Sequence, residues 1–591
     1  MASTIPARLF ENETKYPHKH AYFVKQGDAW QGTTYAELAD ETRRAAKALM
    51  GLGLGRGSTV AILGFNRPEW VIADLACMCI GGAPAGIYTT CSPPEVAYIV
   101  NHAESPVVFV ENRAQWEKLA AERANLPKLK WVVTFKDAEP IDDDIVLSWS
   151  EFLAKAEGIT DEALRAEIDA LEPDGLATFI YTSGTTGPPK GVMLSHENLS
   201  WTADCLREAA GGNHDDVSLS YLPLSHIAEQ LATIHMPITQ GATVYYAESI
   251  DAVADNLKDV RPTVMFGVPR IWEKFHAGIS GKLKDATGIK AKLVTWAQKV
   301  GREASAVRNA GGELSGMLKL RYAIANKLIF SKLKAALGLD RGRVFVSGAA
   351  PISKEVLEFF ASLDIVVQEV YGQSEDTGPT SFNRKGAVKF GSVGPAIPGC
   401  EVKIADDDEI LVRGPNVFLG YYKDPEATDE TLIDGWLHSG DLGKFDADGF
   451  LSITGRKKEI IITSGGKNVA PKNLEAAMKN HELVSEAVVI GDQRKYLTAL
   501  ITLDDEAADK FCNARGLNSV PRHEMKELRA EIQAAIDEMN KSLAKVETVK
   551  KFVILERNFT VDDGELTPTL KVKRRIVNKN WQKQIDALYA E

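Results

Sequence analysis

One stretch of eleven residues, Tyr181–Gly191, combines glycines, hydroxyl side chains and a single lysine, Lys190. It follows an apolar run, Leu176–Tyr181, that predicts a buried strand. Glycines let backbone N–H groups approach a ligand closely, hydroxyls add donors, and the lysine supplies a cation. This chemistry suits a polyphosphate, although a flexible surface loop has a similar composition. It is not a Walker A loop, because two residues separate Gly184 from Gly187 and a glycine follows the lysine.

Three other short stretches carry groups that suit a nucleotide. Tyr371–Glu375 offers an aromatic face for a purine and a hard carboxylate oxygen for magnesium. Gly435–Asp441 ends in a carboxylate that can accept hydrogen bonds from two ribose hydroxyls. Ser347–Pro351 links a predicted strand to a predicted helix. Taken singly, each stretch is also typical of an ordinary turn.

Two basic stretches lie nearer the C-terminus. Gly455-Arg-Lys-Lys-Glu459 separates two regions of different pattern, and its composition alone is that of a charged linker. Leu566-Thr-Pro-Thr-Leu-Lys571 ends in a lysine at the start of the other basic run. Because Lys573, Arg574 and Arg575 follow, the run alone is a basic surface patch, and Lys573 stays an alternative to Lys571.

The elements that must position these groups alternate between strand and helix. Thr34-x-x-Glu37 is a capping box that predicts a helix to about Leu52, and Pro68 opens another helix. Apolar runs predict strands at Val60–Phe65, Ala85–Tyr88, Pro106–Val110, Thr243–Tyr246, Thr263–Gly267 and Val344–Ser347. This alternation predicts a largely parallel sheet with helices on both faces.

Three regions depart from this pattern. Gly278–Leu339 predicts long amphipathic helices rich in Lys and Arg, whose charges form a solvated face or a membrane-surface patch. Gly394–Gly455 predicts short strands with tight turns, in a small antiparallel barrel or distorted sheet with a hairpin turn at Asp446–Gly449. Residues 456–591 form another alternating segment, large enough for a separate α+β domain.

Length and composition bound the remaining possibilities. The chain has 591 residues, too many for a single core, and a net charge of -12 argues against a general nucleic-acid binder. The six cysteines are scattered without zinc spacing, which is typical of a reducing compartment. Neither a signal peptide nor a membrane-spanning run is apparent, so we expect a cytoplasmic protein, with peripheral membrane contact left open.

Tyr181–Gly191 resembles the phosphate-loop signature of the acyl-adenylate-forming superfamily of AMP-binding enzymes, and the other motifs follow in that family's order over nearly the whole chain. The family uses ATP, Mg²⁺ and CoA. The resemblance implies the following ATP- or AMP-binding residues: Thr182, Ser183, Gly184, Thr185, Thr186, Gly187, Lys190, Gly348, Ala349, Ala350, Tyr371, Gly372, Gln373, Ser374, Asp441 and Arg456. Relatives commonly carry Thr where Ser374 stands, and the hydroxyl is retained.

The resemblance also implies roles for the remaining candidates. Glu375 and Thr182 would hold magnesium, Lys571 would neutralise charge between the carboxylate and the α-phosphate, and Lys458 would be the hinge. Ser464-Gly-Gly-Lys467 matches the segment that faces CoA after the C-terminal domain swings, so Gly465, Gly466 and Lys467 are its expected CoA-binding residues.

The fold expected from the resemblance is α/β, with doubly wound sheets and a small barrel-like subdomain at about 394–455. Residues 1–455 would form this large AMP-binding domain, and residues 456–591 a smaller, mobile α+β lid domain.

Two sequence motifs indicate which carboxylic acid the enzyme would activate. Leu222-Pro-Leu-Ser-His226-Ile and Gly267-Val-Pro-Arg-Ile-Trp272 resemble long-chain fatty acyl-CoA synthetases, and Tyr-Gly-x-Ser-Glu hints at the bubblegum-like subgroup. There the histidine lies near the substrate carboxyl and the tryptophan can close an acyl tunnel, although a buried His or Trp is more often core.

We therefore expect a long-chain fatty acid–CoA ligase whose partners are fatty acid, ATP and CoA, with a homodimer left open. Three alternatives remain: an enzyme that loads a carrier protein, a ligase for medium-chain or aromatic acids, and a non-catalytic nucleotide-binding acyl carrier or scaffold.

Overall fold

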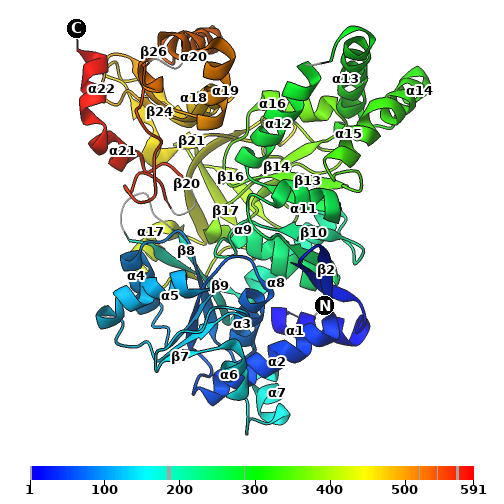
Figure 1. The fold of residues 1–591 in the computed structure, drawn as a ribbon, viewed down its shortest axis with the longest axis vertical. Coiled ribbons are helices and arrows are strands. Elements are labelled where there is room, and N and C mark those ends of the chain that lie inside the picture. The colour runs from blue at the N-terminus through cyan, green and yellow to red at the C-terminus, as the bar shows by residue number, and fades with distance from the viewer. Residues whose placement is uncertain are drawn as a thin grey trace.

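The structure is a computed structural model, and it describes residues 3–182, 188–284, 286–517, 520–541, 543–567 and 571–590. Figure 1 shows the N-terminal and central segments in the lower and right parts of the molecule, with the C-terminal segment at the upper left.

The largest sheet has eight strands in the order β18-β9-β8-β4-β3-β5-β6-β7. The strands from β8 to β7 in this order run parallel, and β9 and β18 are antiparallel to their neighbours. The strands are β3 (Thr59–Leu63), β4 (Ala83–Ile87), β5 (Val107–Val110), β6 (Trp131–Thr134), β7 (Val146–Leu147), β8 (Leu176–Thr182), β9 (Lys190–Ser195) and β18 (Gly420–Tyr421). The predicted, largely parallel sheet is confirmed.

Strand β3 shows why this sheet needs helices on both faces. Successive side chains of a strand point to opposite faces. Val60 and Ile62 pack in the core cluster of helices α2 (Tyr35–Gly51) and α3 (Pro68–Cys79). Ala61 and Leu63 pack in the cluster of α4 (Pro93–His102) and α5 (Arg113–Ala121). The predicted capping box of α2 is present, because Thr34 and Glu37 satisfy each other's backbone N–H groups.

Two four-stranded sheets continue the large domain, in the orders β10-β11-β1-β2 and β12-β13-β14-β15. Their strands are β1 (His20–Gln26), β2 (Ala29–Thr34), β10 (Val217–Ser220), β11 (Thr243–Tyr246), β12 (Val264–Gly267), β13 (Val344–Ser347), β14 (Val367–Tyr371) and β15 (Ser381–Phe382). Strands β12, β13 and β14 are parallel, so their C-terminal ends meet at one edge.

The region predicted to hold long basic helices does so. Helices α12 (Pro269–Lys284), α13 (Gly288–Asn309), α14 (Gly316–Ala325) and α15 (Ser331–Ala336) lie between β12 and β13, and the first begins before the predicted start. Other helices of the large domain are α1 (Ile5–Lys15), α6 (Trp149–Ala154), α7 (Asp161–Asp169), α8 (His196–Ala210), α9 (Ile227–Gln230), α10 (Met236–Gln240), α11 (Val253–Val260), α16 (Lys354–Ser362) and α17 (Pro425–Thr431). None of the described helices is long and apolar enough to cross a membrane.

The expected small β subdomain is an antiparallel sheet of five strands: β16 (Glu401–Ile404), β17 (Glu409–Arg413), β19 (Leu432–Ile433), β20 (Trp436–Phe445) and β21 (Leu451–Arg456). Of the two expected forms, a small antiparallel barrel or a distorted sheet, the structure has the sheet, because β16 pairs with β17 and both β19 and β21 pair with β20. Strand β16 is short and alternately exposed, as suits an edge strand. The predicted hairpin turn at Asp446–Gly449 joins β20 to β21.

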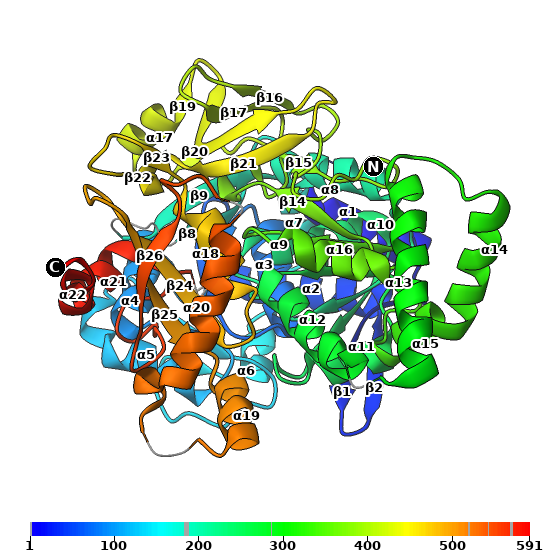
Figure 2. The ribbon, with the colours of Figure 1, turned by 90° about the horizontal axis from the view of Figure 1, so that it is seen from above.

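Beyond the open sheet the chain forms a second α+β unit with its own core. Its elements are β22 (Ile461–Ile462), β23 (Asn468–Val469), α18 (Pro471–Lys479), β24 (Val484–Ile490), β25 (Leu497–Leu503), α19 (Asp505–Arg515), α20 (Lys526–Asn540), β26 (Val549–Ile554), α21 (Arg574–Asn580) and α22 (Gln582–Tyr589). Its buried side chains form two clusters that run from Ile461 to Leu588. Figure 2 shows this unit on the opposite side of the molecule from α13, α14 and α15.

Candidate active site

A β-hairpin positions the two ends of the predicted phosphate loop. Thr182 ends β8 and pairs directly with Lys190, the first residue of β9. The Nζ atom of Lys190 lies 3.3 Å from Oδ2 of Asp424 and 4.7 Å from the centre of the Tyr421 ring. The predicted ligands Ser183, Gly184, Thr185, Thr186 and Gly187 lie outside the described residues.

A carboxylate, a phenol and a guanidinium meet beside this hairpin. The Tyr371 hydroxyl donates to Oδ2 of Asp441 at 2.9 Å, and Nε of Arg456 donates to Oδ1 at 2.8 Å. Asp441 on β20 is the register partner of Arg456 on β21, so sheet pairing alone brings these two together. Burial, reinforced by the Asp441 carboxylate, raises the pKa of Tyr371, which keeps its hydroxyl protonated.

The turns at the ends of β13 and β14 depend on glycine. A Cβ atom on Gly372 would lie 1.5 Å from the backbone oxygen of Gly378, and one on Gly348 would lie 2.5 Å from Cγ1 of Val370. Ala349 has a φ of 67°, a left-handed conformation that costs a non-glycine residue roughly 1 kcal/mol or more. Such backbone geometry is concentrated at functional sites.

The polypeptide continues from the β14 turn into a short 3₁₀ helix, Ser374–Asp376, that presents one carboxylate and buries another. Oε1 of Glu375 accepts a hydrogen bond from the Tyr421 hydroxyl at 2.7 Å. Asp376 is fully buried, which raises the pKa of its carboxyl, and it accepts hydrogen bonds from Gln373 and Thr380. Glu375 is therefore the carboxylate available to a ligand, whereas its neighbour holds the turn.

Lys571 lies close to these groups although it comes from the other end of the chain. Its main chain is fixed by Thr567, which donates to the Lys571 oxygen at 2.7 Å and accepts from its nitrogen at 3.0 Å. The residue is solvent-accessible, yet the surrounding protein lowers its pKa to about 8 through desolvation, with Arg456 and Lys472 adding repulsion. Pro568, Thr569 and Leu570 of the same motif lie outside the described residues.

Lys573, the other candidate catalyst, faces a different partner. Its Nζ atom lies 4.0 Å from Oε1 of Glu95 at the start of α4. The charges of Asp441 and Glu375 act on the pKa of Lys571 and favour its protonated form. Among the basic residues of this run, Lys571 is thus the one near the nucleotide motifs.

A largely apolar cavity of about 160 Å³ extends from this group into the large domain. His226, Tyr371, Gly372 and Gln373 lie at one end, and Asp216 and Arg343 at the other. Its further lining residues include Leu206, Leu219, Ile227, Leu231, Ala232, Met236, Val264, Phe266, Val344, Val346, Val370 and Phe382. The cavity therefore follows β10, β12 and β13 from their C-terminal ends to their N-terminal ends.

Two titratable side chains on the cavity wall are neutral at pH 7. Burial, with Lys571 adding repulsion, lowers the pKa of His226 to about 3, and its Nδ1 accepts from the Ala228 N–H at 3.2 Å. Nε2 of His226 then carries the proton and can donate. Burial raises the pKa of Glu229 to about 8, so this carboxyl is protonated at pH 7. Such a wall suits an apolar chain whose polar head lies beside His226.

Trp272 is not among the residues that line this cavity, and its closing of an acyl tunnel stays a prediction. It is fully buried on α12, packs edge-on against Phe275, Phe345 and Phe360, and donates from Nε1 to the Val346 oxygen at 3.2 Å. Its ring therefore fills the core between α12, α16 and β13. The resemblance of Gly267–Trp272 to long-chain fatty acyl-CoA synthetases does not indicate on which side of β13 the Trp272 ring lies.

Comparison with known proteins identifies the family. The model of the AMP-binding enzyme family matches residues 9–422, and that of the AMP-binding enzyme C-terminal domain matches residues 458–591. The chain belongs to the AMP-binding enzyme family.

Named relatives within this AMP-binding family cover the whole chain. It is similar to a long-chain-fatty-acid–CoA ligase ACSBG2 of Xenopus laevis, with 40% identity over 100% of this chain and 84% of the relative. The identity to ACSBG1 of Homo sapiens is 37%, over 100% of this chain and 85% of the relative.

Solved structures of other proteins share the fold of this AMP-binding enzyme. The A domain of a carboxylic acid reductase from Segniliparus rugosus in complex with AMP aligns with a TM-score of 0.75 at 21% identity, over 99% of this chain and 94% of that one. The anthranilate CoA ligase AuaEII aligns with a TM-score of 0.70 at 20% identity, over 100% and 99% of the two chains. The α/β fold with a large N-terminal and a smaller C-terminal domain is thereby confirmed.

The hinge and CoA candidates of this AMP-binding enzyme lie on exposed turns that follow Arg456. Lys458 is exposed in the short 3₁₀ helix Lys457–Glu459, directly after β21. Gly465, Gly466 and Lys467 form an exposed turn between β22 and β23, and the φ of Gly466 is 70°. A Cβ atom on Gly465 would lie 3.9 Å from Oγ1 of Thr463, and the close approach of CoA to this backbone stays a prediction.

Sequence analysis missed Tyr421 and Asp424, which contact Glu375 and Lys190 respectively. They come from β18 and the start of α17, and β18 reaches the site because it pairs with β9. The aromatic and acidic residues of Gly420-Tyr-Tyr-Lys-Asp424 are a visible signal. Their position in the site depends on the pairing of β18 with β9, which no local sequence pattern reveals.

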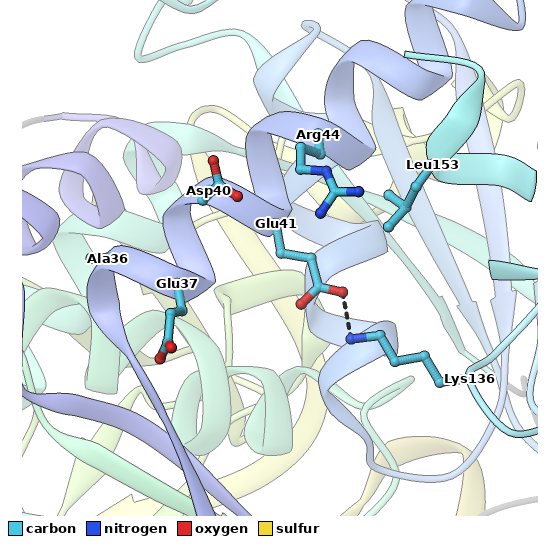
Figure 3. A pocket seen from close by; sticks show the side chains of 7 residues that line it. All are labelled: Ala36, Glu37, Asp40, Glu41, Arg44, Lys136 and Leu153. Carbon is cyan, nitrogen blue, oxygen red and sulfur yellow. Dashed lines mark ion pairs between the residues drawn. The ribbon is translucent and has the colours of Figure 1, made fainter. Parts of the chain in front are cut away.

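A surface hollow of about 590 Å³ lies elsewhere, against α2 (Figure 3). It is lined by Ala36, Glu37, Asp40, Glu41, Arg44, Lys136 and Leu153, none of which belongs to the nucleotide motifs. Lys136 pairs with Glu41 at 2.5 Å, and Glu37 caps α2. Both interactions are structural, so the hollow does not compete with the site described above.

Proposed function

We propose that this AMP-binding enzyme is a long-chain fatty acid–CoA ligase that uses MgATP. The observation that carries the proposal is that Lys571 feels the charges of Asp441 and Glu375 and acts on the pKa of His226, which lines the apolar cavity together with Tyr371. The named relatives act on long-chain fatty acids and cover the whole chain, which supports the same substrate class here.

In the first step an oxygen of the fatty acid carboxylate attacks the α-phosphorus of ATP. A new O–P bond forms, the bond to the bridging oxygen breaks, and pyrophosphate leaves. The Lys571 ammonium lies between the two negative groups, while Lys190 and the loop N–H groups hold the departing pyrophosphate. Asp441 accepts from the ribose hydroxyls, and Tyr371 stacks on adenine. Catalysis of this kind rests on positioning and charge stabilisation.

The residues fit magnesium bound through ATP. Mg²⁺ commonly takes one or two protein carboxylates and completes its shell with phosphates and waters. Glu375 offers one oxygen beyond that bonded to Tyr421. Thr182, the second proposed ligand, lies at the edge of the loop. The ion would neutralise phosphate charge, and Glu375 would fix its position.

In the second step the thiolate of CoA attacks the acyl carbonyl carbon, a C–S bond forms and AMP leaves. We place the boundary between the domains at residues 455 and 456, with Lys458 as the hinge. The separate cores on either side, which end at Ile453 and resume at Ile461, support this boundary. The swing would replace Lys571 by the Gly465–Lys467 turn.

The test is the measurement of pyrophosphate release across fatty acids of increasing length, with and without CoA, for wild type and Lys571→Ala. We expect the variant to lose roughly 3 kcal/mol of transition-state stabilisation, or about 100-fold in rate. Thioester formation from preformed acyl-adenylate should be largely retained. Equal loss in both half-reactions, or a preference of wild type for acetate or benzoate over palmitate, would overturn the proposal.

The same assay separates the alternatives. An enzyme that loads a carrier protein would release pyrophosphate but form no acyl-CoA, and a non-catalytic acyl carrier would do neither. A cytoplasmic location with peripheral membrane contact is part of the proposal, and a homodimer stays a prediction.

A further inference from the structure

Helix α14 and the turns that follow it have apolar residues on two faces. Leu318, Tyr322 and Ile329 pack with Trp296 of α13 in a small core cluster. A second set points outward, although a helix that is apolar all round is normally buried. These exposed residues, which we call the apolar stripe, are Met317, Leu320, Ile324 and Leu328, with exposed fractions of 67, 56, 44 and 40%.

The stripe is continuous in space because its members recur at helical spacing along residues 316–336, which form α14, a π-helical turn and α15. In both views these helices stand at the edge of the molecule, away from the C-terminal domain (Figures 1 and 2). A contiguous apolar surface of this kind marks a contact site on a soluble protein.

Basic residues surround the stripe. Residues 288–339 contain ten Lys or Arg and two Glu, whereas the whole chain has a net charge of -12. Lys319, Lys327 and Lys332 are exposed on the same helical segment, and no ion pair is recorded for them in the described chain. The local charge is therefore opposite in sign to that of the molecule and is free to act on a partner.

We propose that the apolar stripe and its lysines dock on an anionic lipid bilayer. The combination matches such a surface: apolar side chains enter the boundary between headgroups and acyl chains, while lysine stems lie along it and hold their ammonium groups among the phosphates. This deepens the membrane contact included in the proposed function by naming the surface. It rests on the exposed residues themselves.

The position of the stripe relative to the cavity indicates how the membrane contact would serve the enzyme. The segment from α15 leads into Arg343 and Val344, which line the far end of the apolar cavity. If the fatty acid is the substrate, docking holds the enzyme where its substrate is dissolved. The contact would raise the local concentration of acid without changing the chemistry at Lys571.

Sedimentation with vesicles tests the proposal without substrate. Wild type should bind vesicles of equal parts phosphatidylcholine and phosphatidylserine, weakly or not at all phosphatidylcholine alone, and less as salt increases. The double variants Leu320→Glu/Ile324→Glu and Lys319→Glu/Lys327→Glu should each bind at least about tenfold more weakly. Because the substituted side chains are exposed, these variants should fold as wild type does, and circular dichroism checks that they are folded.

Matched controls change the same residue types elsewhere. Ile250→Glu/Ile433→Glu alters two other exposed apolar residues, and Lys526→Glu/Lys583→Glu makes the same charge change on the C-terminal domain. Both should bind as wild type does.

With fatty acid presented on albumin, all variants should release pyrophosphate at the wild-type rate, which separates failure of docking from failure of the proposed function. The proposal would be overturned if wild type failed to bind the anionic vesicles, or if the stripe variants bound them as tightly as wild type does. It would also be overturned if wild type bound neutral and anionic vesicles equally. The proposal would also be overturned if light scattering showed a wild-type dimer that Leu320→Glu/Ile324→Glu converts to a monomer. The stripe would then bind a second copy of the chain and not a membrane.

Discussion

The proposed first step requires Lys571 to be charged, whereas its surroundings oppose that charge. Desolvation and the nearby Arg456 and Lys472 lower the pKa of its ammonium group to about 8. Below that pH the group is protonated and can neutralise the carboxylate and α-phosphate. As the pH rises through 8 it loses its proton and this stabilisation. The residue is thus set near the upper end of the physiological range.

We therefore expect kcat/KM for pyrophosphate release to fall above about pH 8, because this parameter reports the ionisation of the free enzyme. Lys571→Arg should be slower but should keep a flat profile to higher pH, since a guanidinium does not deprotonate there. Thioester formation from preformed acyl-adenylate is the internal control and should not show this decline. A wild-type profile that is flat to pH 10 would contradict the assignment.

Tyr421 is a positioning residue that acts through Glu375. Its hydroxyl fixes one carboxylate oxygen at 2.7 Å. Hydrogen bonds to charged groups contribute about 1.5–3 kcal/mol, so Tyr421→Phe should slow pyrophosphate release roughly tenfold or more. The loss should shrink at high Mg²⁺ concentration if the carboxylate serves the metal.

The neighbouring Tyr422 supplies the control for this measurement. Its ring packs against His102 and Phe179, and no contact with Glu375 is recorded in the described chain. Tyr422→Phe should therefore leave the Mg²⁺ dependence unchanged. Equal effects of the two substitutions would show that packing in this loop, and not the bond to Glu375, limits the reaction.

At the scale of elements, the cavity between the strands and α9–α10 is the proposed acyl-binding site. Ala232 lies on its wall, midway along the chain between the α9 and α10 helices. Ala232→Phe would fill the cavity, so kcat/KM for palmitate should fall while that for shorter acids is retained. Each methylene that loses burial costs about 0.8 kcal/mol, so a displaced chain loses several-fold in rate per carbon.

Trp272 provides the contrast, because it belongs to the core and not to the cavity wall. Trp272→Ala should cost ~3–5 kcal/mol of unfolding free energy, measured in a denaturant titration. The chain-length profile of the folded fraction should stay that of wild type. A profile that flattened in a folded variant would support the gate predicted from the sequence string.

These elements also show what a sequence can and cannot predict. The strands β11 and β13 and the capping box of α2 follow from local periodicity and hydrogen bonding, which act over a few residues. The approach of Tyr421 to Glu375 and the place of Trp272 depend on pairing and packing between distant segments. The open edge of the small sheet likewise depends on which strands fail to meet.

The candidate site divides in the same way. The types of Lys190, Asp441 and Arg456 were predictable because their chemistry is visible in single motifs. Their contacts arise from the register of β20 and β21 and from the hairpin of β8 and β9. Only the fold supplies those distances.

For the whole molecule, the ion pairs across the proposed domain boundary fall into two groups among the described residues. Beside the hinge, Arg456 pairs with Asp441, and Lys457 pairs with Asp407 and Glu409. Farther from it, Lys573 lies 4.0 Å from Glu95. Arg270 of α12 pairs with Asp504 at 3.0 Å across the interface, and both side chains are partly solvent-exposed. Exposed ion pairs contribute about 0–1 kcal/mol, so they do not lock the arrangement. We therefore expect the weak Arg270–Asp504 pair not to prevent a rotation about the proposed hinge at Lys458.

Lys458→Pro tests that movement. Proline fixes φ and removes an N–H, which should hinder the rotation that follows adenylation. We expect pyrophosphate release on the first turnover and little acyl-CoA, in a rapid-quench measurement of both products. Lys458→Ala removes the same charge but leaves the backbone free, and should form thioester. The hinge assignment is wrong if the proline variant keeps the wild-type ratio of the two half-reactions.

The pairing of Asp441 with Arg456 has one more consequence. Arg456 is the last residue of its strand, and the exposed turn that contains Lys458 begins immediately after it. The strand pair that carries the proposed ribose-binding residue Asp441 thus leads directly into the proposed hinge. We expect a nucleotide bound to Asp441 to make this pair of strands more rigid, and release of AMP to make it less so. We expect the smaller domain to return to the arrangement for adenylation only after AMP has left, so that AMP release sets when the next cycle can begin.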